Sequence, residues 1–390
     1  MSVELHRTAA GFPRFSETEY RNRIALVRKL MEREGVHALL VHGSGGAGAP
    51  IHYLTNYPGV RPTWLLFPAE GESTLLLQFQ NHIPNAVAMT VAGEIGCYQP
   101  SAAAAVAAEI RKRGLDSAGV GIVGLGASIP FAQFDELRRL LPSVRFSDLG
   151  RRYSELRWIR SAEELAWIRN AAGMADAACR RLSERIRPGM SEYELESIIH
   201  DAVVPQGGQV GIAFLSSTSM GASDRCSPWQ FLAPRKIEKG DVITTELSVN
   251  FWGYGAQIHR PYAVGAPPND LYRRLYDAAL ECFEAVREVL VPGATGEDVI
   301  RAGACVEQRG FLLFDSLCHG EGGRNPELGA SGSGHAFESW EFKENQVMVI
   351  QPNPVTHDRT AGLQLGSSVR VGPKGGEVLH AYPFEFTVCG

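Results

Sequence analysis

The sequence lacks the features by which membrane, secreted and nucleic-acid-binding proteins are usually recognised. It contains no run of about 18 apolar residues, so we expect no membrane span. Its first residues, Met-Ser-Val-Glu-Leu-His-Arg, have no apolar segment of the kind found in signal peptides. The net charge is -5 and no basic run exceeds three residues, which argues against a nucleic-acid partner.

Cysteine is too sparse and too scattered for a disulfide framework. The seven cysteines are an odd number, and no two of them form a Cys-x-x-Cys pair. This pattern is typical of reduced thiols, so we expect a cytoplasmic protein without a zinc ribbon. The 390 residues are 44% hydrophobic and 21% charged, which predicts a soluble globular protein with two domains.

The first 150 residues alternate between helical and strand-like patterns, which predicts a self-contained α/β domain. Helices are expected over 17–35, 102–113 and 131–141, and strands over 38–42, 52–56, 63–68, 73–78 and 119–124.

A glycine-rich segment, 43–48, follows the first of these strands. A phosphate-binding loop requires a helix N-terminus directly after its glycines. Here Pro50 and the strand-like Ile51-His52-Tyr53 come next. We therefore interpret the segment as a plain turn and expect no dinucleotide site.

The second part of the chain contains a repeat. The segment 187–195, Arg-Pro-Gly-Met-Ser-Glu-Tyr-Glu-Leu, recurs as 291–299, Val-Pro-Gly-Ala-Thr-Gly-Glu-Asp-Val. In each copy Pro-Gly ends a long helix, and Ser or Thr with an acid three residues later begins a short one. The spacing indicates two halves related by a pseudo-twofold axis, unless common capping chemistry has recurred by chance.

A β-hairpin is predicted over 240–264, where two β-rich runs flank Trp252-Gly253. Since side chains alternate along a strand, Glu246, Ser248 and Asn250 share one face. For the same reason Gln257 and His259 share a face of the second strand. Such a polar face either borders a cleft or forms a satisfied structural network.

Short motifs along the whole chain match one known family in the same order. The first part contains Tyr53-Leu54-Thr55-Asn56-Tyr57 and Arg61-Pro62-Thr63. The second part contains the segment 159–164, Gly240-Asp241, Gly253-Tyr254, Arg260, His319-Gly320 and the segment 375–379. In these motifs the chain resembles the creatinase/prolidase/aminopeptidase P family. The resemblance implies an α/β (α+β) fold: a creatinase-type N-terminal α/β domain, residues 1–152, then a pita-bread catalytic domain with an internal pseudo-twofold repeat, residues 153–390.

The resemblance also implies where the family's two divalent metals would bind. Peptidases of this family use two aspartates, one histidine and two glutamates. The matching positions in this sequence are Glu246, Gln257, His319, Gln351 and Gly366. One carboxylate cannot offset the charge of two divalent cations in a pocket of low dielectric, and amide oxygens are weak ligands for Mn, Zn or Co. We therefore predict no tightly bound catalytic metal and no cofactor.

The family also includes metal-free members, among them creatinase and ectoine hydrolase. The catalytic pair of creatinase is not reproduced, because Trp229 and His259 stand at its positions. The remaining catalytic candidates are Glu246 as general base or nucleophile, and His259 and His319 as proton carriers near neutral pH.

The remaining candidates would bind the substrate. Gln257 and Gln351 stand at positions that match metal ligands of the family, and Gln364 lies two residues before a third such position, Gly366. Their amides would orient a planar polar group of the substrate. Asn250 and Tyr254 belong to the same hairpin. Arg260 holds the strands together or binds a substrate carboxylate, and Trp229 walls the pocket or belongs to the core. Arg61 would reach over the cleft of a partner subunit in the homodimer that the resemblance implies.

Our leading hypothesis from the sequence is a metal-independent hydrolase that cleaves a C–N bond of a small amide, amidine or urea. Three alternatives remain open at this point. They are an Xaa-Pro peptidase with an atypical metal site, a non-catalytic protein that binds a small molecule, and a metal-free lyase that uses the same base.

Overall fold

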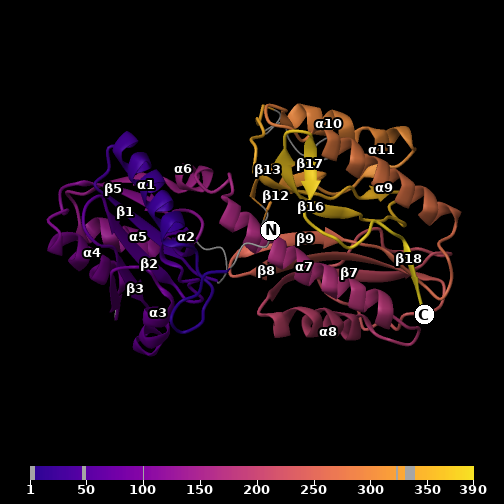
Figure 1. The fold of residues 1–390 in the computed structure, drawn as a ribbon, viewed down its shortest axis with the longest axis horizontal. Coiled ribbons are helices and arrows are strands. Elements are labelled where there is room, and N and C mark those ends of the chain that lie inside the picture. The colour runs from indigo at the N-terminus through magenta and orange to yellow at the C-terminus, as the bar shows by residue number, and fades with distance from the viewer. Residues whose placement is uncertain (1–4, 46–49, 100, 322–323, 330–338) are drawn as a thin grey trace. The chain divides into compact units, whose positions relative to one another are not determined.

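The protein is described from a computed structural model, in which residues 5–45, 50–99, 101–321, 324–329 and 339–390 are placed (Figure 1). The chain divides into two compact units, Met1–Trp158 and Ile159–Gly390. The boundary expected after residue 152 lies inside helix α6 (Gly150–Glu155), which belongs to the first unit.

The first unit is a mixed sheet flanked by helices. Its strands lie in the order β4-β3-β2-β1-β5-β6, with β1 parallel to β5 and antiparallel to β2. A core that includes Leu40, Trp64 and Ile122 packs between this sheet and helix α4. The strands are β1 (Ala38–Gly43), β2 (Thr63–Pro68), β3 (Thr74–Leu77), β4 (Glu94–Cys97), β5 (Gly119–Val123) and β6 (Arg145–Asp148), and the helices are α1 (Glu17–Arg33), α2 (Pro50–Thr55), η1 (Gln80–His82), α3 (Ile83–Met89), α4 (Ala102–Lys112), α5 (Phe131–Leu140) and α6.

One predicted strand, 52–56, is wrong, because the chain forms helix α2 there. Residues 51–55 are all buried, so their side chains show no alternation, and packing prevails over β-propensity. The Thr55 hydroxyl donates to the Ile51 carbonyl, 2.8 Å away, and Asn56 ends the helix with a φ of 61°. The phosphate-binding loop at 43–48 was rejected because a strand was expected directly after it, so that reason is also wrong. Residues 46–49 themselves lie outside the described part of the chain.

The second unit is built on a long curved sheet. The strands lie in the order β13-β12-β14-β16-β9-β8-β10-β18, with β7 beside β8 and β17 beside β16. Its strands are β7 (Gln209–Ser219), β8 (Asp241–Phe251), β9 (Tyr254–His259), β10 (Tyr262–Val264), β12 (Cys318–Gly320), β13 (Arg324–Leu328), β14 (Val347–Ile350), β16 (Gly366–Gly372), β17 (Gly375–Val378) and β18 (Thr387–Cys389), and a separate pair is formed by β11 (Leu312–Leu313) and β15 (Pro354–Val355).

Two groups of helices cover the two halves of this sheet. Helices α7 (Ala162–Arg185) and α8 (Glu192–Val203) pack on β7, β8 and β9, and α9 (Asp270–Val289) packs on β14 and β17 (Figure 1). The remaining helices are η2 (Val204–Gln206), α10 (Gly296–Gly303) and α11 (Cys305–Gln308).

The two halves repeat the same local structure. Ser191 and Thr295 each open a helix with a capping box, closed by Glu194 and Asp298. The glycine two residues before each cap has a φ of 90°, which is costly for other residues. In both halves the segment around the cap bridges a second chain segment, Ser191 to Lys236 and Thr295 to Glu341. The internal duplication expected from the sequence is thus present in the backbone.

Within the described residues, we find no helix that is both long and apolar enough to span a membrane.

Candidate active site

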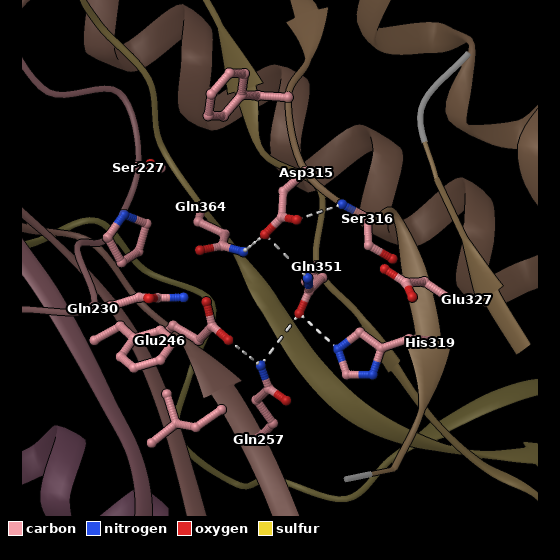
Figure 2. Close-up of a pocket in the computed structure, with 14 residues that line it drawn as sticks. Ser227, Gln230, Glu246, Gln257, Asp315, Ser316, His319, Glu327, Gln351 and Gln364 are labelled. Carbon is pink, nitrogen blue, oxygen red and sulfur yellow. Dashed lines mark hydrogen bonds between the residues drawn. The ribbon is translucent and has the colours of Figure 1, made fainter. Parts of the chain in front are cut away.

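A cavity of about 450 Å³ lies in the second unit, where the two halves of the sheet meet (Figure 2). Strands β7, β8, β9, β12 and β13 contribute to it, together with Gln351, which directly follows β14, and Gln364, which precedes β16. Its lining consists of Ile212, Phe214, Ser227, Pro228, Gln230, Glu246, Gln257, Phe314, Asp315, Ser316, His319, Glu327, Gln351 and Gln364. Five predicted site residues therefore lie together: Glu246, Gln257, His319, Gln351 and Gln364.

The predicted hairpin brings the first two of these residues together. Strands β8 and β9 pair through a two-residue turn in which Trp252 and Gly253 have φ angles of 49° and 90°. Positive φ at both central residues is the geometry of a type I′ turn, whose twist suits a hairpin. In the resulting register the Gln257 amide Nε2 donates to Glu246 Oε1 at 2.8 Å.

The hydrogen bonds continue from this pair across the floor of the cavity. Gln257 Nε2 also lies 3.3 Å from Gln351 Oε1, and His319 Nε2 lies 3.0 Å from the same oxygen (Figure 2). His319 Nδ1 lies 2.8 Å from the Gly320 carbonyl. Both ring nitrogens thus lie close to an oxygen atom, one of a side-chain amide and one of the backbone.

Glu246 has a strongly shifted ionisation. Burial, the charge of Asp315 and a weaker opposing effect of the Gln257 hydrogen bond together raise the pKa of Glu246 to about 7. A carboxyl group in this range gains and loses a proton near neutral pH, as a general base must.

Sequence reasoning missed Asp315, which belongs to the same cavity. Its Oδ2 lies 3.4 Å from Gln351 Nε2 and 3.5 Å from Gln364 Nε2, while its Oδ1 accepts from the Ser316 amide at 2.7 Å. The signal in the sequence was an acid directly after the strand-like run 311–314 and four residues before His319.

His259 does not line the cavity. Its ring is fully buried, and neither ring nitrogen has a hydrogen-bond partner among the described residues. Burial above all, together with the nearby His319, lowers the pKa of His259 to about 3. A histidine that stays neutral cannot carry protons near pH 7, so the proton-carrier role expected for His259 is withdrawn.

Arg260 is a structural residue in this arrangement and not a substrate ligand. Its guanidinium is fully buried and donates to the backbone carbonyls of His259, Gly366, Tyr382 and Pro383 at 2.7–2.9 Å. It also lies over the Phe384 ring, 4.1 Å from the ring centroid. These contacts tie β9 to β16 and to the C-terminal segment.

Four further candidates also lie outside the cavity lining. The Tyr254 hydroxyl donates to Glu164 Oε1 at 3.0 Å inside the second unit, and Asn250 lies at the turn end of β8. Trp229 is 43% exposed, between the lining residues Pro228 and Gln230. Arg61 is an exposed residue of the first unit.

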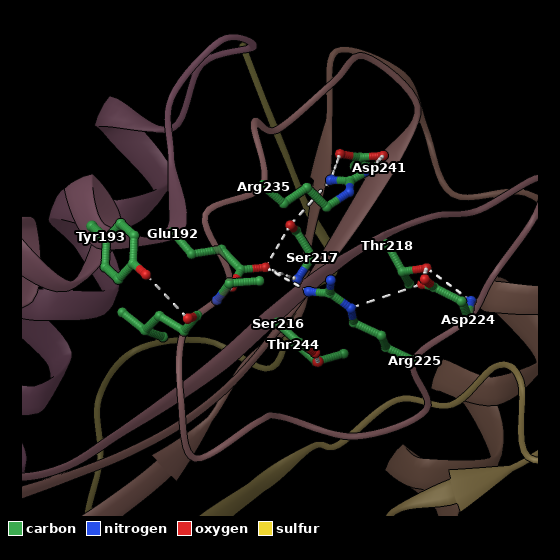
Figure 3. A network of polar contacts seen from close by, with 12 residues as sticks. Glu192, Tyr193, Ser216, Ser217, Thr218, Asp224, Arg225, Arg235, Asp241 and Thr244 are labelled. Atoms are coloured by element: carbon green, nitrogen blue, oxygen red, sulfur yellow. Dashed lines mark hydrogen bonds and ion pairs between the residues drawn. The ribbon is translucent and has the colours of Figure 1, made fainter.

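A buried polar network holds the segment that carries Ser227, Pro228 and Gln230 (Figure 3). Glu192 is fully buried and accepts from the Ser217 amide and hydroxyl, from Arg225 Nη1 and from the Ala233 amide, at 2.6–3.0 Å. The guanidinium of Arg225 in turn lies 4.0 Å from the centroid of the Trp229 ring. The network thereby fixes one wall of the cavity from behind.

The residues present do not fit a pair of divalent metals. Among the described residues, no three His, Cys, Asp or Glu side chains are grouped so as to hold a metal ion. Gln257 points an amide N–H at Glu246, where a metal ligand would offer an oxygen. At Gly366 a Cβ atom would lie 2.4 Å from the Ile350 carbonyl oxygen, so no ligand side chain can be placed there without a shift of the backbone.

Comparison with protein-family models gives two matches that together cover most of the chain. Residues 166–373 match metallopeptidase family M24, and residues 23–159 match the creatinase/prolidase N-terminal domain. Among curated proteins, an uncharacterised hydrolase/peptidase of Sinorhizobium fredii, y4tL, is 28% identical over 96% of this chain and 97% of its own length. An Xaa-Pro dipeptidase of Pyrococcus horikoshii is 23% identical over 67% of this chain and 73% of its own length.

Solved structures show the same fold. A prolidase from Thermococcus sibiricus superposes with a TM-score of 0.80 at 21% identity, covering 96% of this chain and all of that one. The dipeptidase PepE from Mycobacterium ulcerans superposes with a TM-score of 0.77 at 21% identity, covering 96% of this chain and 99% of that one. The creatinase-type domain and the pita-bread domain expected from the sequence are confirmed.

Proposed function

The chain belongs to metallopeptidase family M24, and from that premise we propose that it hydrolyses a C–N bond without the two-metal centre of the family's peptidases. The observation that carries this proposal is the Glu246–Gln257 hydrogen bond. It joins the two positions that the family resemblance matches to two aspartate ligands. It leaves one carboxyl group whose pKa is raised to about 7 and whose orientation is fixed by an amide.

We assign Glu246 the role of general base. Its ionised carboxylate removes a proton from a water molecule, and the hydroxide oxygen bonds to the substrate carbon. The proton held by Glu246 then passes to the substrate nitrogen as the C–N bond breaks, so that one water is consumed and the base is regenerated. Gln257 keeps Oε1 of Glu246 occupied and directs the other carboxylate oxygen toward the water.

The other polar residues orient and position. Gln351 accepts from both Gln257 and His319, so it links the base to the imidazole through a single oxygen. We propose that His319 fixes this amide, and with it the floor of the cavity.

Peptide hydrolysis is the second candidate function, and its support is the relatives. An Xaa-Pro dipeptidase of Pyrococcus horikoshii aligns with two thirds of this chain, and a peptide bond is itself a C–N bond. Against it stands the ligand set, in which amides and a glycine replace acids.

One experiment separates the two functions. The purified protein is incubated with a panel of small amides, amidines, ureas and Xaa-Pro dipeptides, with and without EDTA and with added Mn²⁺, and release of ammonia or amine is measured. Turnover that EDTA leaves unchanged and that Glu246→Gln abolishes supports the proposal. Turnover of dipeptides only with Mn²⁺ overturns it in favour of a metallopeptidase.

A further inference from the structure

We propose that Cys282 and Cys305 form a reversible disulfide by exchange with a small-molecule disulfide such as oxidised glutathione. The two residues belong to the helical layer of the second unit and lie outside the cavity lining, so this chemistry is independent of the proposed function.

The two cysteines meet where helix α11 packs on helix α9 (Figure 1). Cys282, on α9, belongs to a buried hydrophobic cluster, and Cys305, the first residue of α11, packs against the same cluster. Their thiol groups are hydrogen-bonded to each other. Cys282 Sγ also lies 3.9 Å from the carbonyl oxygen of Gly303, at the end of α10. Contact between the two side chains is the geometric precondition for a disulfide.

The two thiols differ in exposure and in reactivity. Among the seven cysteines, Cys97 and Cys305 are partly exposed, and the others, Cys282 included, are buried. The hydrogen bond with Cys282 is the main cause that lowers the pKa of Cys305, whereas the same contact and burial raise the pKa of Cys282. Since the thiolate is the nucleophile in disulfide exchange, Cys305 is the first of the pair to react.

All seven cysteines lie in the described part of the chain, and no third one shares this contact. Cys318 belongs to the same hydrophobic cluster, but burial alone raises the pKa of its thiol, without a contribution from another cysteine. Cys97 lies in the first unit, where its thiol donates to the Gln78 carbonyl at 3.6 Å. A disulfide in the folded chain therefore has one candidate pairing.

The exchange consists of two thiol–disulfide steps. The Cys305 thiolate attacks one sulfur of oxidised glutathione, so that a bond forms between Cys305 and one glutathione while the other leaves as a thiolate. The Cys282 thiol then loses its proton to the departing glutathione and attacks the Cys305 sulfur, which releases the second glutathione. Two protein thiols are oxidised and one glutathione disulfide is reduced to two thiols. Excess reduced glutathione reverses both steps.

The disulfide would join two elements on either side of the cavity wall. Helix α9 packs on strands β14 and β17, and α11 leads through β11 to Phe314, Asp315 and Ser316, which line the cavity. Oxidation would tie the start of this segment to the helix that covers the sheet. The redox state of the pair is thereby linked to the cavity through one continuous stretch of chain.

The pairing is tested on the intact, folded chain equilibrated with reduced and oxidised glutathione at fixed ratios. After acid quenching and alkylation, mass spectrometry of the peptides shows which thiols are lost and which peptides are linked. We expect Cys282 and Cys305 to be lost together as one linked peptide, in a fraction that follows the glutathione ratio and returns to zero with dithiothreitol. Absence of this link at every ratio, or a link that forms only in urea, overturns the proposal.

Variants test the order of the two steps. Cys282→Ala should stop after the first step and accumulate glutathione on Cys305. Cys305→Ser should leave Cys282 a free thiol, because glutathione does not reach the buried group. Cys97→Ser removes the other partly exposed cysteine and is the matched control, which should form the link as the wild type does. Loss of the link in this control, or glutathione on Cys282 in Cys305→Ser, would overturn the assignment.

Discussion

His259 and Gly366 face each other in the register of β9 and β16, and the histidine ring fills the space where a side chain at 366 would begin. A Cβ atom on Gly366 would lie 2.9 Å from His259 Cδ2 and 2.4 Å from the Ile350 carbonyl oxygen. In the family resemblance, position 366 corresponds to a glutamate ligand of the peptidases. The packing of a buried histidine and of the Ile350 carbonyl excludes a side chain at this position unless the backbone shifts.

The first prediction concerns this contact. Gly366→Ala should destabilise the protein by about 1–3 kcal/mol, because the added methyl group must displace strand β14. The matched control is Gly173→Ala on α7, where nothing lies within 4 Å of the added Cβ. That exposed helical position should gain about 0.5–1 kcal/mol instead. Urea unfolding of both variants measures the two effects, and an unchanged midpoint for Gly366→Ala would contradict the packing argument.

Local patterns in the sequence were sufficient for much of this fold. The alternation along 241–259 predicted the hairpin, in whose register Gln257 faces Ser248 and reaches Glu246 diagonally. The repeated capping boxes predicted the duplication, since capping depends on residues only three positions apart. The same kind of reasoning failed at α2, where burial of residues 51–55 removes the periodicity that distinguishes a helix from a strand.

The parts of the site that were missed depend on distant contacts. Nothing near Asp315 in the sequence shows that Gln351 and Gln364 will meet it, because these residues come from different segments of the second half. Likewise, the strand alternation that placed His259 with Gln257 could not show that the His259 ring would be enclosed beside Gly366. Exposure and ionisation follow from tertiary packing, which a pattern of residue types does not encode.

The second prediction is that Glu246→Gln abolishes turnover. An amide cannot accept the proton of water, so activity should fall by about 10²–10⁴-fold, the usual contribution of a general base. The fold should remain, because the carbonyl oxygen of the substituted side chain can still accept from Gln257. Glu288→Gln, at an exposed position on α9, is the control and should retain full activity. Activity in Glu246→Gln equal to that of the wild type would reject Glu246 as the base.

The third prediction is the pH dependence of activity. Because the base acts when ionised, kcat/KM should rise about tenfold per pH unit below pH 7 and level off above it. The charge of Asp315 contributes to raising the pKa of Glu246, so Asp315→Asn should move this limb to lower pH. The control is Asp201→Asn, at an exposed position on α8 outside the cavity, where the limb should stay in place. If the limb also stays in place in Asp315→Asn, the two carboxylates do not interact.

The fourth prediction is a pH dependence of stability from the same group. The pKa of Glu246 rises from 4.5 to about 7 on folding, so the folded state holds the proton more tightly. The stability that Glu246 contributes is fully present below pH 4.5 and is lost as the pH rises through 7. Relative to the wild type, Glu246→Gln should therefore gain on the order of 2–3 kcal/mol between pH 4.5 and pH 8. Urea unfolding of both proteins across this range measures the difference, and a constant difference would contradict the shift.

The last prediction concerns metal ions, and it compares the natural ligand set with a partly restored one. In the wild type, Mn²⁺ should not raise the melting temperature, because Glu246 and His319 are the only acid and imidazole at the matching positions. The double variant Gln257→Asp with Gln351→Glu adds two carboxylates beside Glu246 and His319, on side chains that already lie within hydrogen-bonding reach of them.

This double variant should gain Mn²⁺-dependent stabilisation, which grows with metal concentration as binding to the folded state alone requires. The matched control is Asn81→Asp with Gln99→Glu, at exposed positions of the first unit outside the cavity. It also adds one aspartate and one glutamate, and it should show no response to Mn²⁺. Strong stabilisation of the wild type by Mn²⁺ would mean that the amides serve as ligands after all. In that case the peptidase interpretation of the cavity would replace the metal-free one.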